Sequence, residues 1–209
     1  TGLSVARYLL GQGVQVAITD SREQPPGLER LRAEYADVAV FLGRFDDQVF
    51  EQADMLVVSP GVPLQTPQIQ AAVARGVPVV GDIELFARVA RAPVVAITGS
   101  NGKSTVTTLV GEMARAHGAR VAVGGNIGTP ALDLLDDEVE LYVLELSSFQ
   151  LETTQSLQAA VATVLNVSAD HMDRYPNLEA YAAAKEVVMQ GAGLGVYNAD
   201  DAQVMKMQG

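Results

Sequence analysis

The sequence predicts an α/β protein built from two domains, each with a parallel sheet. Three observations lead to this prediction. Short apolar stretches alternate with helical stretches, the alternation breaks and restarts near residues 81–93, and one apolar stretch runs directly into a glycine-containing loop. Strands that alternate with helices form parallel sheets with right-handed crossovers. We therefore expect a Rossmann-like domain over residues 1–81 and a second, central domain over residues 82–209.

The first domain opens on a helical pattern and then alternates strands with helices. Leu3, Ala6 and Leu9 fall on one helical face, and a strand over residues 14–19 closes on Asp20. Beyond this strand we expect helices over residues 28–35 and 66–75, and strands over residues 38–42, 54–58 and 77–80. Because a βα unit ordinarily begins with a strand and none precedes the first helix, we expect residues to be missing on the amino-terminal side.

The second domain begins with a short helix over residues 82–90 and a joint at Arg91-Ala92-Pro93. In a helix expected over residues 104–117, the apolar positions 106, 109, 110 and 113 share one face and are expected to be buried. The remaining elements we expect are a helix over residues 177–189 and strands over residues 94–98, 120–124, 140–146, 160–165 and 194–197. The last residues carry no capping pattern, so we expect the carboxyl side to be cut as well.

Composition excludes several classes of function. The chain has 209 residues, with 14 Lys and Arg against 25 Asp and Glu and a net charge of −11. This acidic balance argues against a broad nucleic-acid or membrane surface, which needs clustered cations. The absence of cysteine excludes disulfides, thiolate metal sites and cysteine nucleophiles. No apolar run approaches the roughly 18 residues of a membrane span and no signal-peptide pattern is present, so we expect a soluble cytoplasmic protein.

The most specific motif joins an apolar strand to a helix. After residues 94–98 the chain continues as Gly99-Ser100-Asn101-Gly102-Lys103-Ser104-Thr105. In such loops glycines let backbone N–H groups converge on phosphate, the lysine brings a charge to the β- and γ-phosphates, and the serine hydroxyl serves Mg²⁺. The pattern G-x-x-x-x-G-K-[ST] would need glycine at Ile97, so the match is to a shorter form, G-x-N-G-K-S. A glycine-rich turn with a solvated lysine is the alternative.

This shorter loop resembles the ATP loop of the Mur ligases, a family that includes the folylpolyglutamate synthases. The similarity runs from Thr1 to about Asp201, and the Ser-Ser-Phe-Gln-Leu-Glu string resembles in particular the members that add D-glutamate. The other segments that carry it are residues 59–61, 81–86, 124–128, 144–152 and 165–175. The resemblance implies a Rossmann-like UDP-binding domain followed by a P-loop ATPase-type central domain, with the family's C-terminal domain absent.

The same resemblance implies an activity. It is that of an ATP-dependent ligase joining D-glutamate to UDP-N-acetylmuramoyl-L-alanine through an acyl phosphate, in cytoplasmic peptidoglycan precursor synthesis. ATP and two Mg²⁺ ions would serve as cofactors, and the protein would be a monomer without nucleic-acid or membrane partners. Because the domain that receives D-glutamate is absent, we expect this fragment alone to be inactive. The alternatives are a sister ligase or folylpolyglutamate-synthase-like ligase with another amino acid, a nucleotide-gated switch, and a dinucleotide-dependent dehydrogenase.

Four residues are candidates for metal binding. Glu145 ends an apolar strand, where a carboxylate is costly unless it meets a metal ion or an arginine. His171 lies between acids in a loop, where a surface histidine is as good an interpretation as a metal ligand. Lys185 ends an alanine-rich helical stretch, which by itself favours a solvated surface lysine. The resemblance makes metal ligands of Ser104, Glu145, His171 and Lys185, with Lys185 carbamylated by CO₂, and gives Lys103, His171 and Lys185 catalytic roles.

Substrate contacts are expected in both domains. Asp20 closes a strand at the position where dinucleotide-binding folds place an acid for ribose. The resemblance implies that Asp20 contacts uracil or ribose instead. It also implies that further residues of both domains contact the diphosphate, the sugar or its peptide end. The full set of expected substrate-binding residues is Thr1, Gly2, Asp20, Ser21, Arg22, Ser59, Gly61, Asn126, Ser147 and Gln150.

Overall fold

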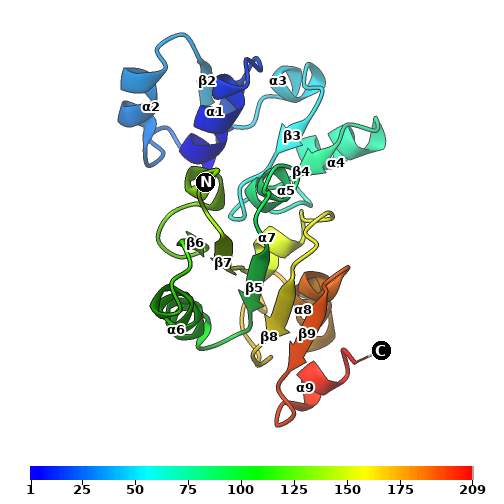
Figure 1. Ribbon diagram of the computed structural model, residues 1–209. Helices are drawn as coiled ribbons and strands as arrows, with labels where there is room; N and C mark the ends of the chain where they lie inside the picture. Colours follow the sequence, from blue (N-terminus) through cyan, green and yellow to red (C-terminus); the bar gives the residue numbers. More distant parts are fainter. Residues whose placement is uncertain (209) are drawn as a thin grey trace. The chain divides into compact units, whose positions relative to one another are not determined.

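The computed structural model describes residues 1–208, which fall into two compact units that meet between Val80 and Gly81. Each unit consists of parallel strands connected by helices, which confirms the predicted α/β class (Figure 1). Among the helices of residues 1–208, none has both the length and the hydropathy that crossing a membrane requires.

The first unit carries its strands in two separate pairs rather than in one sheet. Strand β1 pairs in parallel with β2, and β3 pairs in parallel with β4. A small core of Phe50, Val58 and Ile69 lies beneath the second pair. The elements are α1 (Gly2–Gly11), β1 (Ala17–Asp20), α2 (Leu28–Glu34), β2 (Ala39–Leu42), α3 (Asp47–Glu51), β3 (Leu56–Val57), α4 (Pro67–Ala74) and β4 (Val79–Val80).

The second unit contains a five-stranded parallel sheet in the order β6-β7-β5-β8-β9 (Figure 1). Its central strand β5 is buried along most of its length, as expected for a strand covered on both faces. The elements are α5 (Asp82–Ala87), β5 (Val94–Thr98), α6 (Lys103–Ala116), β6 (Val121–Gly125), the 3₁₀ helix η1 (Ala131–Leu134), β7 (Leu141–Glu145), α7 (Ser148–Leu151), β8 (Val161–Val164), α8 (Leu178–Glu186), the 3₁₀ helix η2 (Val187–Met189), β9 (Leu194–Tyr197) and α9 (Ala202–Met205).

The direction of the chain connections along the sheet reverses at β5. The connection from β5 through α6 to β6 runs one way along the sheet, whereas those through α7 and α8 run the other way. Because parallel crossovers are right-handed, α6 covers one face and α7 and α8 cover the other. The helices therefore diverge where β5 ends, and open α/β sheets bind ligands at such a switch point.

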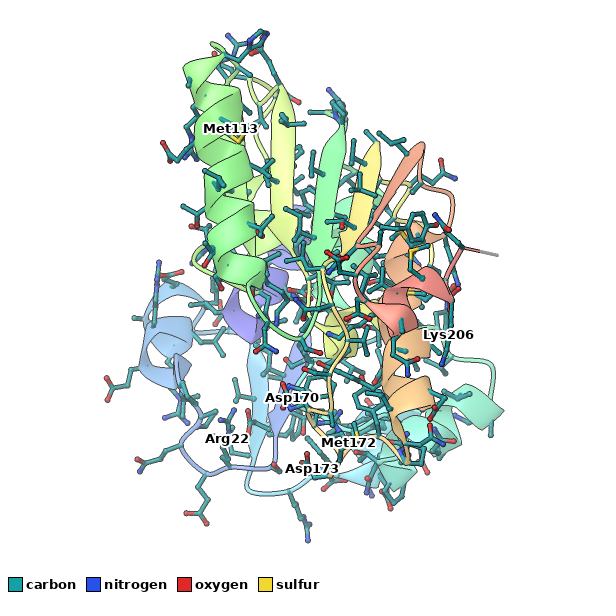
Figure 2. The ribbon with its side chains drawn as sticks, turned by 90° about the horizontal axis from the view of Figure 1, so that it is seen from below. Arg22, Met113, Asp170, Met172, Asp173 and Lys206 are labelled. Atoms are coloured by element: carbon teal, nitrogen blue, oxygen red, sulfur yellow. The ribbon has the colours of Figure 1, made fainter. Side chains whose placement is uncertain are left out.

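The prediction for the buried face of α6 was partly wrong. Leu109 and Met113 are 56% and 63% exposed, and Figure 2 shows Met113 on this helix. The buried positions are instead Thr107 and Gly111. A Cβ added at Gly111 would lie 2.5 Å from Cγ2 of Val123, so the helix approaches β6 through its smallest residue. This close approach turns two of the large apolar side chains outward.

A buried carboxylate ties α5 to the loop after α7. Glu84 is 2% exposed, and its Oε2 accepts the N–H groups of Gln155 at 2.7 Å and Ser156 at 2.9 Å. Its Oε1 accepts the Ser156 hydroxyl at 2.8 Å and Nε of Arg88 at 2.9 Å. Burial by itself would raise the pKa of Glu84, but these hydrogen bonds outweigh it and lower the pKa.

We predict that Glu84→Gln lowers the free energy of unfolding by about 2 kcal/mol at neutral pH, because the buried donors lose a charged acceptor. A lowered pKa means that the carboxylate stabilises the fold above its unfolded pKa of about 4.3 and loses this effect as pH falls through the folded pKa. The difference from wild type should therefore shrink in acid. Urea unfolding measures it, with the exposed Glu186→Gln as control. Equal stability of the two variants would contradict this role for Glu84.

Candidate functional site

The loop between β5 and α6 has a backbone that only glycine adopts easily. Gly99 has φ 151° and Gly102 has φ 78°, both in the region that favours glycine. A Cβ at Gly99 would also lie 3.1 Å from that of Leu165, so the loop passes close to the chain after β8. Gly102 is the N-cap of α6, and a Cβ there would meet nothing within 4 Å. The loop thus faces open space just where the helix begins.

The start of α6 offers backbone donors to a ligand. Val106 N–H donates to Gly102 O at 3.0 Å, but within residues 1–208 the N–H groups of Lys103, Ser104 and Thr105 have no protein acceptor. Such first-turn N–H groups, together with the helix dipole, bind anions. Nζ of Lys103 donates to Ser100 O at 3.0 Å, so the ammonium lies across the loop rather than extending into solvent. This geometry suits a phosphate group.

Glu145 stands beside this loop at the end of β7 and is 2% exposed. The Ser104 hydroxyl donates to its Oε2 at 2.7 Å, and Nδ2 of Asn126 donates to its Oε1 at 2.7 Å. In the described part of the chain Glu145 forms no salt bridge, so it is not the arginine-paired acid that was the alternative. A carboxylate and a hydroxyl oxygen are donors of the kind that Mg²⁺ prefers.

Residues 1–208 contain no group of three or more acidic or histidine side chains that could hold a metal ion on their own. An ion at Ser104 and Glu145 would therefore have to complete its shell with phosphate oxygens and water, as Mg²⁺ commonly does. His171 lies in the exposed loop after β8, where Figure 2 places Asp170, Met172 and Asp173. Its backbone φ is 54°, and its Nε2 is 3.6 Å from Oδ2 of Asp170.

Lys185 is not the solvated surface lysine that its local sequence favours. It is 1% exposed, and its Nζ donates to Gly99 O at 2.9 Å, so α8 reaches the loop between β5 and α6. The ammonium also lies 4.3 Å from the ring centroid of Tyr181. It forms no salt bridge within residues 1–208. Burial, with a smaller contribution from the charge of Lys103, lowers the pKa of Lys185 to about 7.

An aromatic cluster links His171 to Lys185. The His171 ring is 4.9 Å from that of Phe149 and 6.2 Å from that of Tyr181. Tyr175 stacks on Phe149 at 5.8 Å and donates its hydroxyl to Glu152. The structure thus places the Tyr181 ring near both His171 and Lys185.

Three of the expected substrate residues lie at the carboxyl edge of the same sheet and already have partners. Ser147 and Gln150 form a capping box on α7, in which Ser147 Oγ accepts Gln150 N–H at 3.2 Å and Gln150 Oε1 accepts Ser147 N–H at 3.1 Å. Nε2 of Gln150 points to Asp82 at 3.5 Å. Asn126 is held by Glu145. The side chains are fixed in position, and a substrate would meet a preformed surface.

The other expected substrate residues belong to the first unit. Nε and Nη2 of Arg22 donate to Asp20 at 2.9 and 2.7 Å, and these hydrogen bonds lower the pKa of Asp20. Asp20 is the last residue of β1, so both charges lie at the carboxyl end of a parallel strand. The remaining residues of this set are Thr1 and Gly2 at the start of α1, Ser21 after β1, and Ser59 and Gly61 after β3.

Two contributors to the site escaped the sequence analysis as functional residues. Asn166 and Ser168, just after β8, hydrogen-bond to Ser100 and Asn101 of the loop between β5 and α6. The available signal was their position, because polar residues at the carboxyl ends of parallel strands meet at one edge of the sheet.

Comparison with known proteins matches both units. The family model described as the Mur ligase MurD-like N-terminal domain matches residues 1–81, and that of the Mur ligase middle domain matches residues 97–209. The UDP-N-acetylmuramoylalanine–D-glutamate ligases of Marinobacter nauticus and Pseudomonas syringae pv. syringae are 61% and 63% identical over 202 residues. Each alignment covers 97% of this chain and 45% of the relative, so the chain spans less than half the length of these curated relatives.

Solved structures with low sequence identity share the fold. The UDP-N-acetylmuramate–alanine ligase MurC of Thermotoga maritima matches with a TM-score of 0.57 at 22% identity, covering 98% of this chain and 48% of that one. The UDP-N-acetylmuramate:L-alanyl-gamma-D-glutamyl-meso-diaminopimelate ligase of Neisseria meningitides matches with a TM-score of 0.63 at 17% identity, covering 98% and 69%.

Proposed function

The chain belongs to the Mur ligase family, and we propose that it carries the ATP site and part of the UDP-sugar site of a ligase that joins D-glutamate to UDP-N-acetylmuramoyl-L-alanine. Relatives about 60% identical bear the name of that enzyme. The observation that carries the proposal is the meeting of Lys103, the open amides of α6 and the Ser104–Glu145 pair where β5 ends. The reaction would be a cytoplasmic step in peptidoglycan precursor synthesis.

The proposed reaction first activates a carboxylate, which is a poor acyl donor. The γ-phosphoryl group of ATP would pass to the carboxylate oxygen of the UDP-sugar peptide, giving an acyl phosphate and ADP. The amine of D-glutamate would then attack the carbonyl carbon and lose a proton. Inorganic phosphate would leave from the tetrahedral intermediate, and an amide would remain.

This chemistry gathers negative charge, which the site's own residues would offset. The first-turn amides of α6 would donate to phosphate oxygens, and Lys103 would move from Ser100 O to the β- and γ-phosphates. Lys103 lies close enough to Lys185 for its charge to lower the pKa of Lys185, within an otherwise anionic chain. The charge of Lys103 beside the open amides of α6 favours a polyphosphate.

Ser104 and Glu145 would hold the first Mg²⁺ ion, since their oxygens already touch and border the phosphate site. The ion would supply charge neutralisation at the transferred phosphoryl group. For the second site we propose His171 together with a carbamylated Lys185. A neutral lysine amine attacks CO₂, forms an N–C bond and releases a proton, which leaves a carboxylate-like anion. The burial and lowered pKa of Lys185 support this modification, because they keep the amine partly neutral near pH 7.

We predict that Glu145→Gln raises the KM for Mg²⁺-ATP in the full-length protein about tenfold or more. The amide keeps the size of the side chain but removes the charge that would hold the ion, an effect comparable to losing a charged hydrogen-bond partner. Initial rates at varied Mg²⁺ and ATP measure the change. Glu140→Gln is the control, because Glu140 precedes the same strand and pairs with Arg120 on the surface. An unchanged KM in Glu145→Gln would remove this residue from the metal site.

The proposed function itself is tested by supplying the full-length protein with ATP, UDP-N-acetylmuramoyl-L-alanine and each candidate amino acid in turn. Incorporation of D-glutamate is expected. Preference for another amino acid would make the protein a sister ligase, and ATP hydrolysis without a UDP-sugar acceptor would favour a nucleotide switch.

A further inference from the structure

The side chain of Asn166 forms three hydrogen bonds with the loop between β5 and α6. Its Oδ1 accepts the N–H groups of Ser100 at 3.1 Å and Asn101 at 2.8 Å, and its Nδ2 donates to Asn101 O at 3.0 Å. Its backbone oxygen also accepts the Ser100 N–H at 2.9 Å. The half-buried side-chain amide of Asn166 thus pairs with both the N–H and the C=O of Asn101. It also adds a second acceptor for the Ser100 N–H.

The segment after Asn166 continues this attachment. The Ser168 N–H donates to Ser100 Oγ at 3.0 Å, the Ser100 hydroxyl donates to Ser168 O at 3.1 Å, and Nδ2 of Asn101 reaches Ser168 Oγ at 3.2 Å. Val167 N–H donates to Oδ2 of Asp201, which caps α9. The strand end is therefore fixed on one side by α9 and on the other by the loop.

These contacts divide the loop amides into two groups. Those of Ser100 and Asn101 point away from any ligand, toward Asn166. Those of Gly102, Lys103, Ser104 and Thr105 have no protein acceptor within residues 1–208. Only the second group is open to an anion.

We propose that Asn166 is a positioning residue for ATP: by binding the amides of Ser100 and Asn101, it fixes the loop so that Gly102 and the first turn of α6 present their N–H groups to the phosphates. Asn166 acts through the loop and need not touch the nucleotide. The inference rests on the proposed function, because it takes ATP as the ligand of this loop.

The first test compares Asn166→Ala with Asn198→Ala in the full-length protein. Asn198 is a matched control, since it follows the neighbouring strand β9 and hydrogen-bonds to Leu165 O at 2.8 Å and Asp200 N–H at 3.1 Å without contacting the loop. Loss of about one to two hydrogen bonds predicts a KM for ATP raised about tenfold or more in Asn166→Ala. The KM for the UDP-sugar and the ATP kinetics of Asn198→Ala should stay near wild type. An unchanged KM for ATP, or equal increases for both substrates, would overturn the proposal.

A second measurement needs no nucleotide and remains available if the alanine variant fails to fold. Hydrogen exchange of the ligand-free protein should show protected Ser100 and Asn101 amides in wild type and in Asn166→Asp, which keeps the accepting oxygen. In Asn166→Ala the Asn101 amide should exchange faster, whereas the Ser100 amide keeps the backbone oxygen of residue 166 as an acceptor. Fast exchange of both amides in wild type would refute the positioning role even if ATP binds. Protected amides in a protein that does not use ATP would instead reject the proposed function and, with it, the role toward ATP.

Discussion

Lys103→Ala in the full-length protein is expected to lower turnover by about 10²-fold or more, comparable to the loss of one preorganised donor that stabilises a transition state. Within residues 1–208 its ammonium donates to the neutral oxygen of Ser100, at 3.0 Å, and to no carboxylate, so it is available to a ligand with more charge. The amides of α6 contribute partial charges, and no other lysine lies on the loop. The variant therefore removes the loop's only full positive charge.

Steady-state rates with ATP and the UDP-sugar measure this effect, and the chain offers a closely matched control. Lys206, like Lys103, donates to a neutral oxygen three residues earlier in the chain, in this case Oε1 of Gln203 at 3.1 Å. Unlike Lys103, it lies exposed on the second unit (Figure 2). Lys206→Ala should leave turnover within about twofold of wild type, the usual result for a surface change. Near-normal turnover in Lys103→Ala would defeat its assignment to the phosphates.

Lys185→Ala is expected to lower turnover by a similar factor, about 10²-fold or more. Two losses combine in this variant: the hydrogen bond to Gly99 O at the phosphate loop, and the carbamate that we propose as a metal ligand. Because a neutral amine is needed to capture CO₂, the carbamylated fraction at fixed dissolved CO₂ should rise as pH increases through about 7, the lowered pKa of Lys185.

Carbon-13 NMR of the full-length protein under labelled CO₂ measures this modification directly. A carbamate signal is expected in wild type and in Lys206→Ala and should be missing in Lys185→Ala. If the signal persists in Lys185→Ala, the modification lies elsewhere. If no signal forms in wild type at any pH, Lys185 is not carbamylated and is not a ligand of the second metal ion.

The sequence allowed the strands of the second unit to be placed well because they are short apolar runs bounded by glycine, proline or charge. The predicted strands at 94–98 and 194–197 match β5 and β9. Three short helices, α3, α7 and α9, were missed because four or five residues do not complete a hydrophobic period. Their capping side chains, Asp46, Ser147 and Asp201, were the only local signal.

Features of the site that depend on long-range packing could not be predicted from local patterns. Lys185 looks solvated in its alanine-rich segment, and only its contact with Gly99, 86 residues away, shows that it is buried. Helix α6 exposes Leu109 because Gly111 lets it approach the sheet closely. By contrast, the phosphate loop and the Ser104–Glu145 pair follow from residue types at strand ends, which a parallel sheet brings to one edge.

The central claim is that the loop from Gly99 to Thr105 binds the phosphates of ATP. A crystal structure of the full-length protein with ADP and Mg²⁺ tests it most directly. We predict the β-phosphate at the first turn of α6, within hydrogen-bond distance of the open amides, with Nζ of Lys103 moved from Ser100 O onto a phosphate oxygen. A nucleotide bound elsewhere, with Lys103 still on Ser100 O and the loop empty, would contradict the account.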